Sequence, residues 1–283
     1  METVRGRESM NIFKTTIQTA IKRPFIPILI GSIMLAAAIF NAFIPIMAMI
    51  IGIVNMTGGG FFDSMLSVLQ MLIDPENIPI MLISLAALAV IVSVTIGLLL
   101  PGFLLIVDDG LERGKKRKGL FAEGLKKYFF RFLLMALKTS FFTLMLIVFL
   151  LVASVPAIIV TRATMTTNPD LLLAAIFMDI VTFGVFFMCL SFFSAYIYMW
   201  YIAASKGVAK PFKEGKAVAD RGFWNISLSF LLFDIVFAAT IYLIYSSDSQ
   251  LFRYVSGWIF ATGFFTTLAV YLVSAYRKIA EQK

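Results

Sequence analysis

Three ionisable residues, Lys138, Asp179 and Asp234, interrupt long runs of apolar residues that otherwise contain no charge. A charged side chain at the centre of a membrane costs about 2.5–3.5 kcal/mol on insertion scales, and such residues commonly mark ion or proton pathways. Asp234 lies near the middle of its run, whereas Asp179 lies closer to one end. These three residues are therefore interpreted as a candidate intramembrane polar site, and Asp234 is the strongest functional candidate among them.

Each of these residues also has a structural explanation. The long stem of Lys138 would allow its ammonium group to reach the membrane interface. Asp179 is expected to be paired, or protonated and hydrogen-bonded. For Asp234 two hypotheses stay open: a neutral acid bonded to a neighbouring helix, or a carboxylate in a water-filled cavity that binds a cation or relays a proton. Ser227 and Ala238 share its helical face and would leave room beside it.

The residue types on which many enzymes depend are missing. The sequence contains no histidine, and Cys189 is its only cysteine, which excludes histidine bases, imidazole metal ligands and thiolate clusters. It also contains no Gly-x-Ser-x-Gly motif. We therefore expect no enzyme activity, no cofactor and no metal site. An intramembrane enzyme that uses carboxylates alone is the distant alternative.

The apolar runs are the elements that must position these side chains. Hydrophobic residues make up 60% of the 283 residues and charged residues 14%, against about 25% charged residues in a soluble domain. Six runs reach the roughly 20 residues that a spanning helix needs. The predicted spans lie near residues 26–54, 78–107, 132–160, 171–204, 222–246 and 254–276. Because lipid excludes unpaired backbone, the predicted fold class is all-α, a polytopic bundle of six transmembrane helices in one membrane domain, residues 1–283.

The distribution of basic residues predicts the orientation. All but Arg162 and Arg253 of the 24 Lys and Arg residues lie in the terminal segments or in and next to the connections that follow the second and fourth spans. Positively charged loops stay in the cytoplasm, so both termini are predicted to be cytoplasmic in a multi-pass protein of the plasma membrane. The net charge of +8 indicates attraction to anionic headgroups at that face. We expect no nucleic-acid partner, because a basic run beside a membrane helix is the ordinary inside marker.

An amphipathic stretch with a phenylalanine precedes each span that runs outward. The first stretch lies in the cytoplasmic N-terminal segment, residues 1–25, and the others begin at Phe121 and Phe212. An apolar face opposite a charged face is typical of a helix lying among lipid headgroups. Phe121 and Phe212 are therefore predicted to lie at the membrane interface. Two interpretations stay open: three repeated units of amphipathic helix plus hairpin, or polar connections that each need an aromatic anchor.

Two of these stretches carry related motifs, Leu120-Phe121-Ala122-Glu123-Gly124 and Pro211-Phe212-Lys213-Glu214-Gly215, each after a span that runs inward. In these motifs and in its hydropathy pattern the chain resembles uncharacterised six-span prokaryotic membrane families, including the membrane domain attached to some glycerophosphodiester phosphodiesterases. The resemblance implies a membrane-embedded helical domain of unassigned activity. The phosphodiesterase activity does not carry over, because these residues include no soluble phosphodiesterase domain, and no site residues carry over either.

Two further expectations concern the first third of the chain. Residues 61–73 have polar and apolar faces and are predicted to form an interfacial helix on the outer leaflet, with a re-entrant loop as the alternative. The basic pair Lys22-Arg23 and the apolar stretch after it resemble a cleaved signal peptide. The apolar run continues well past Ala38, so the first helix is expected to be retained.

These patterns leave two main hypotheses about function. A solute transporter, or the membrane subunit of a transport complex, would use Asp234. The alternative is a non-catalytic membrane module that organises lipid or recruits a protein partner through its amphipathic stretches.

Overall fold

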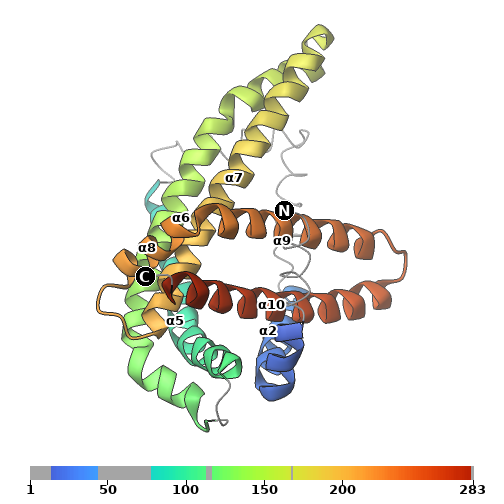
Figure 1. The fold of residues 1–283 in the computed structure, drawn as a ribbon. Coiled ribbons are helices and arrows are strands. Elements are labelled where there is room, and N and C mark those ends of the chain that lie inside the picture. The colour runs from blue at the N-terminus through green and yellow to red at the C-terminus, as the bar shows by residue number, and fades with distance from the viewer. Residues whose placement is uncertain (1–13, 44–77, 113–116, 167, 282–283) are drawn as a thin grey trace, which may run out of the picture. The chain divides into compact units, whose positions relative to one another are not determined.

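The computed structural model describes residues 14–43, 78–112, 117–166 and 168–281. Within these ranges the protein is all-α, as predicted, and contains no strand. A short helix, Lys14–Lys22, is followed by α2 (Phe25–Phe43), α5 (Ile78–Leu111), α6 (Leu120–Thr166), the 3-10 turn η1 (Pro169–Leu171), α7 (Leu172–Ser205), α8 (Pro211–Arg221), α9 (Phe223–Tyr245) and α10 (Gln250–Glu281) (Figure 1). The predicted interfacial helix at residues 61–73 lies outside the described residues.

Five of the described helices, α5, α6, α7, α9 and α10, are long and apolar enough to cross a membrane. The helix Lys14–Lys22 and α2 make a sixth candidate if they count as one span, although they are bent by 91° at the break between them. Each of the six predicted spans therefore coincides with a helix, the first as far as it is described. By the length and composition of its helices, the chain is a multi-pass membrane protein.

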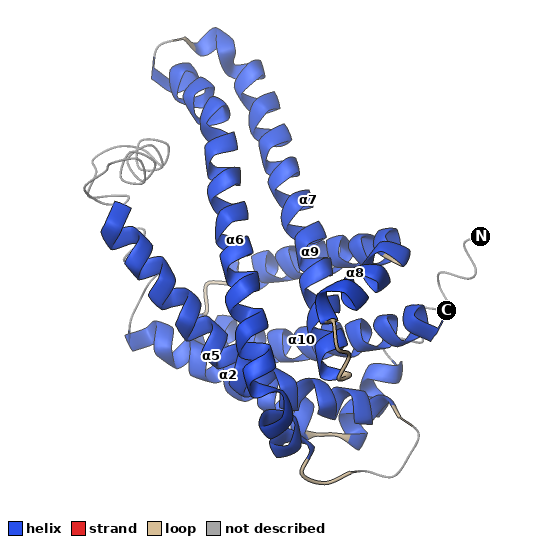
Figure 2. Ribbon diagram, turned by 90° about the vertical axis from the view of Figure 1, so that its left-hand side faces the viewer, coloured by secondary structure: helices blue, strands red, loops and turns tan. Residues whose placement is uncertain are grey.

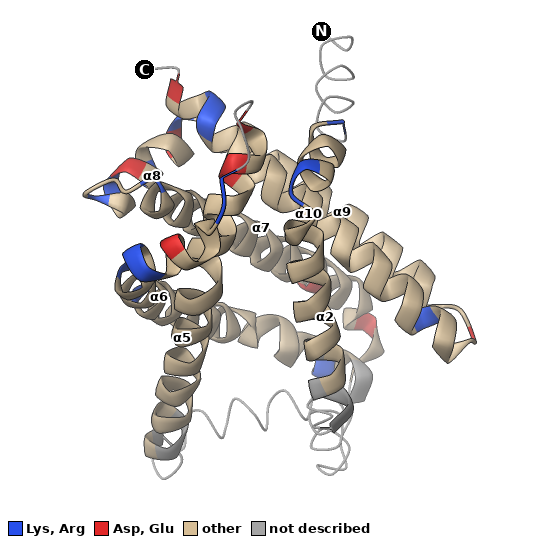
Figure 3. Ribbon diagram, turned by 90° about the horizontal axis from the view of Figure 1, so that it is seen from below, with Lys and Arg blue, Asp and Glu red and all other residues tan. Residues whose placement is uncertain are grey.

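The surfaces of these helices are strongly apolar. Leu173 is 82% exposed, Phe130 74% and Phe183 73%, and many other large apolar side chains are exposed along the spans. Figure 3 shows that α2 and most of α5 carry no charged residue. Soluble proteins rarely expose apolar surface on this scale, so these faces are suited to lipid tails.

Several hydroxyl side chains within the spans bond to the backbone of their own helices. Ser93 Oγ donates to the carbonyl of Ala89 at 2.6 Å, and Thr266 Oγ1 donates to that of Thr262 at 2.7 Å. This local pairing satisfies a polar group where water is absent.

The chain folds into two compact units. Unit 1 comprises Met1–Ile39, Thr95–Leu133 and Ser191–Lys283, and unit 2 comprises Phe40–Val94 and Leu134–Leu190. The helices α5, α6 and α7 each contribute one part to unit 1 and another to unit 2. Within unit 2, the segments of α6 and α7 run antiparallel side by side (Figure 2).

Unit 1 contains the antiparallel hairpin of α9 and α10 (Figure 1). Phenylalanine rings line the contact between the two helices, with the centroids of Phe237 and Phe264 4.9 Å apart. Two exposed aromatic residues, Trp224 and Tyr245, lie at opposite ends of α9. At about 1.5 Å per residue they are about 31 Å apart along the helix axis. This distance matches the roughly 30 Å hydrocarbon core, whose two interfaces favour such residues.

The three amphipathic stretches adopt different forms. The first is bent away from α2 just before Pro24, and the third is the separate helix α8, which Gly222 divides from α9. The second continues without a break into the 47-residue helix α6, because no Gly or Pro separates it from the span that follows. A helix of this length rises about 70 Å, so part of α6 must extend beyond a hydrocarbon core of roughly 30 Å.

The two Phe-x-Glu-Gly motifs nevertheless make the same kind of contact. A Cβ atom added at Gly124 would lie 2.8 Å from the Cα atom of Gly102 in α5. One added at Gly215 would lie 2.8 Å from the Cα atom of Trp200 in α7. In both cases the amphipathic segment packs directly on the backbone of the helix that precedes it. The repeated-unit interpretation stays a prediction.

Candidate functional site

Asp234 lies in the middle of α9 and is half-buried. Its Oδ2 atom accepts a hydrogen bond from Ser191 Oγ of α7 at 3.2 Å. Among the described residues Ser191 is its only hydrogen-bond partner, and no Lys or Arg forms an ion pair with it. Asp234 is therefore held by a single neutral donor from another helix.

The predicted polar face around Asp234 has two different environments. Ser227, two turns earlier in α9, is 2% exposed, and its Oγ atom has no hydrogen-bond partner within the described structure. Ala238, one turn later, is exposed. Between Ser227 and Asp234, the ring of Phe230 stacks on Tyr198 of α7 with their centroids 5.3 Å apart. The face thus leads from a close α7–α9 contact to an open surface.

Asp179 has a different partner, within unit 2. Thr161 Oγ1 of α6 lies 3.0 Å from each of its two carboxylate oxygens and donates a hydrogen bond to them. Thr161 is 5% exposed, whereas Lys138 of α6 is exposed. Lys138 and Asp179 belong to unit 2, and Asp234 belongs to unit 1. Whether the three residues form one candidate polar site stays a prediction.

Among the described residues, each of the two carboxylates accepts a hydrogen bond from a hydroxyl group and forms no ion pair. A hydroxyl group donates one hydrogen bond but does not neutralise a negative charge. An isolated carboxylate is very costly to place in an apolar medium.

Phe121 and Phe212 both pack against the protein itself. The Phe121 ring meets the ring of Phe25 edge-on, with centroids 5.7 Å apart, and the Phe212 ring meets that of Trp200 edge-on at 5.1 Å. Both phenylalanines are half-buried. Their insertion at a membrane interface stays a prediction.

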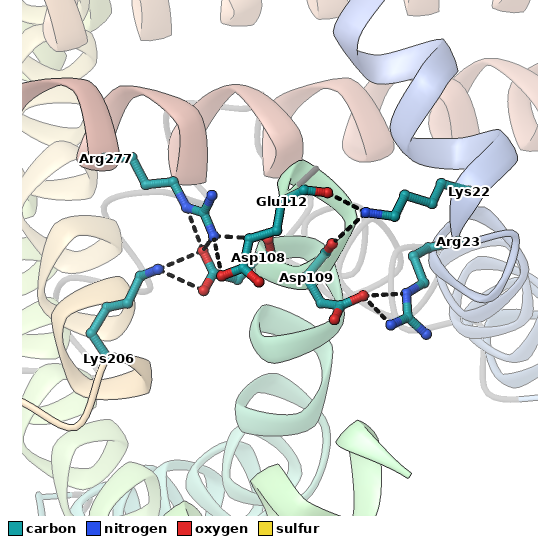
Figure 4. A network of polar contacts seen from close by, with 7 residues as sticks. All are labelled: Lys22, Arg23, Asp108, Asp109, Glu112, Lys206 and Arg277. Carbon is teal, nitrogen blue, oxygen red and sulfur yellow. Dashed lines mark hydrogen bonds and ion pairs between the residues drawn. The ribbon is translucent and has the colours of Figure 1, made fainter. Parts of the chain in front are cut away.

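A second polar site was missed by the sequence reasoning. It lies at the C-terminal end of α5 and is called here the charge network (Figure 4). Three acidic residues contact four basic residues from other segments. Asp108 and Asp109 of α5, with Glu112 directly after it, contact Lys22, Arg23, Lys206 and Arg277.

Asp108 and Asp109 point to different partners in this network. Lys206 Nζ lies 2.5 Å and Arg277 Nε 2.6 Å from Asp108 Oδ1. Arg23 Nε lies 2.6 Å from Asp109 Oδ2, and both of these side chains are 6% exposed. Lys22 donates to the backbone carbonyls of Asp109 and Glu112.

The basic partners have a clear physical role. Acidic side chains are unfavourable at the C-terminal end of a helix, where the carbonyl groups already give a partial negative charge. Lys22, Arg23, Lys206 and Arg277 offset this charge. The sequence contains a signal for the network. The segment Asp108-Asp109-Gly110-Leu111-Glu112 has three acidic residues directly after the second predicted span, on the side that is rich in Lys and Arg.

The charge network brings four helix ends together within unit 1. It joins the segment before α2 to the last turns of α5 and α10 and to Lys206, directly after α7. Six alternating spans would place these four ends on one side of a membrane. The network is compatible with that topology, which stays a prediction.

A cavity of about 330 Å³ lies beside the network. Residues of α8, the last turns of α10 and the segment after α7 line it, including the charged residues Lys206, Glu214, Arg221, Arg277 and Glu281. Among the described residues, no three His, Cys, Asp or Glu side chains are grouped so that they could hold a metal ion.

Comparison with known proteins gives no match: no family model, curated protein or solved structure is significantly similar to this chain.

Proposed function

We propose that this multi-pass membrane protein is a transporter, or the membrane subunit of a transport complex, in which Asp234 takes up and releases a proton or a cation. One observation supports this most directly. Asp234 lies in the middle of a spanning helix, and its only described partner is the hydroxyl group of Ser191. A carboxyl group in that position needs a positive charge that the described residues do not supply.

The neighbouring groups are suited to such an exchange. A deprotonated Asp234 accepts the Ser191 hydrogen bond, whereas a protonated Asp234 can itself donate one. Carboxylate and hydroxyl oxygens are hard ligands of the kind that hard cations prefer. The proposal includes no enzyme activity.

In the proposed orientation, the charge network and both termini lie on the cytoplasmic side of the plasma membrane. Its support is the excess of Lys and Arg on that side. The resemblance to six-span prokaryotic membrane families agrees with this topology and leaves the transported solute unassigned.

A lipid-organising or partner-binding module is the second candidate, and α8 favours it. Gly215, Val218 and Ala219 of α8 are buried, whereas Lys213 and Lys216 are exposed. A helix of this kind binds anionic headgroups or a protein partner at the membrane surface. Nucleic acid is not proposed as a partner.

The test is a flux measurement on purified protein in liposomes that contain a pH-sensitive dye. Imposed gradients of H⁺, Na⁺ or K⁺ should produce a flux in wild-type protein that Asp234→Asn abolishes. Asp248→Asn, the same change in the exposed turn of the α9–α10 hairpin, is the matched control and should keep the flux. The proposal fails if wild-type protein gives no flux above that of empty liposomes, or if Asp234→Asn and Asp248→Asn behave alike.

A further inference from the structure

The cavity beside the charge network carries both signs of charge. Arg221 of α8 contributes a guanidinium group, and Glu214 and Glu281 contribute carboxylates. Lys206 and Arg277 also line it, but both are bound to Asp108. Among the described residues Arg221, Glu214 and Glu281 form no ion pair.

These unpaired charges restrict the kind of ligand. A simple anion would be attracted by Arg221 but repelled by the two carboxylates. A simple cation would be attracted by the carboxylates but repelled by Arg221. Lys206 and Arg277 do not change this balance, since Asp108 and Glu112 already offset their charges. The complementary ligand is a zwitterion, with an anionic group for Arg221 and a cationic group for Glu214 and Glu281.

We propose that this cavity binds the headgroup of a zwitterionic phospholipid that carries a phosphate and a primary ammonium group. The planar guanidinium of Arg221 can bind two phosphate oxygens at once. The ammonium group has three donors for the carboxylates of Glu214 and Glu281. The volume of about 330 Å³ is at the low end for ligand sites, so it suits a headgroup rather than a whole lipid.

The position of the cavity indicates a lipid rather than a soluble zwitterion. Its walls are the amphipathic helix α8 and the ends of two spanning segments. Directly after α8, Trp224 is 66% exposed at the start of α9, where an aromatic side chain marks a membrane interface. The inference depends on the membrane topology but not on transport through Asp234.

The test measures binding of phosphatidylethanolamine, phosphatidylcholine and phosphatidylglycerol to the detergent-solubilised full chain by native mass spectrometry. Phosphatidylethanolamine should bind at least about tenfold more tightly than the other two, because only it offers both charge-assisted contacts. Arg221→Gln should remove most of this binding. Lys213→Gln, which also removes one positive charge but from an exposed residue of α8 outside the cavity, should not.

Glu281→Gln tests the ammonium contact separately. Glu281 is exposed in the last turn of α10, so its replacement should leave the fold intact while reducing the preference over phosphatidylcholine. Asp234→Asn should leave lipid binding unchanged, which separates this inference from the proposed transport. Equal binding of the three lipids by wild-type protein would overturn the proposal. Unchanged binding of phosphatidylethanolamine by Arg221→Gln would overturn it too. Equally tight binding of free phosphoethanolamine would overturn the assignment of the ligand as a lipid.

Discussion

Arg23 and Asp109 form a buried ion pair although they lie 86 positions apart in the sequence. Arg23 Nε is 2.6 Å from Asp109 Oδ2, and both side chains are almost fully shielded from solvent. The pair fixes the segment before α2 against the end of α5. It is therefore a direct contact between the first and second candidate spans.

Removing one partner of this pair should strongly destabilise the protein. Arg23→Gln leaves the Asp109 carboxylate buried without a cation, for which the usual cost is about 3–5 kcal/mol. Thermal unfolding in detergent measures the change. Arg117→Gln is the control, since Arg117 and Glu123 form an exposed pair that should contribute no more than about 1 kcal/mol. Equal losses in the two variants would contradict the assigned role of the buried pair.

The two glycines of the Phe-x-Glu-Gly motifs should not tolerate a side chain. Gly124→Ala and Gly215→Ala each place a methyl group 2.8 Å from backbone atoms of the neighbouring helix, and overpacking of this kind costs about 1–3 kcal/mol. Gly184→Ala and Gly257→Ala are matched controls, because a Cβ atom there would have no neighbour within 4 Å. Thermal unfolding should separate the two groups, and a common shift in all four variants would rule out the close helix contacts.

Replacing Phe121 and Phe212 together by Asp should weaken folding without changing the topology. The change removes the ring contacts with Phe25 and Trp200 and places charge on the apolar faces of both amphipathic segments. The yield of monodisperse protein in detergent and the results of reporter fusions measure the two effects. A yield equal to that of wild-type protein would show that these faces are not needed for packing or membrane contact.

Reporter fusions test the six-span topology. Fusions after Lys118, Lys213 and Lys283 should report the cytoplasm, because these positions lie on the side rich in Lys and Arg. Fusions near Asp74, Asn168 and Asp248 should report the outside. A cytoplasmic signal at Asp74 or Asp248 would be incompatible with six spans.

The sequence was sufficient to predict the helices, since hydropathy and the need to satisfy the backbone in lipid are both local properties. The predicted span at 132–160 became the longer helix α6 because nothing in Leu125–Phe132 interrupts the amphipathic stretch. Hydropathy carries less information about helix boundaries on the polar side, where both a turn and a continued helix can be solvated.

The lateral neighbours of each helix could not be predicted in the same way. Asp234 was identified from its position alone, but its contact with Ser191 depends on how α7 meets α9, which no periodicity encodes. Asp109 was overlooked because its importance comes from a partner 86 positions away. In a membrane all helices are similarly apolar, so their packing depends on a few polar pairs and small residues.

The central claim is that Asp234 exchanges a proton or a cation within the membrane. A hydrophobic carbodiimide tests it directly, because this reagent enters lipid and forms a stable adduct with protonated carboxyl groups. Mass spectrometry should find the adduct at Asp234, at a rate that falls as the pH rises and in the presence of the transported cation, and Asp234→Asn should lack it. No adduct at Asp234 at any pH, or labelling that neither pH nor any cation alters, would contradict the claim.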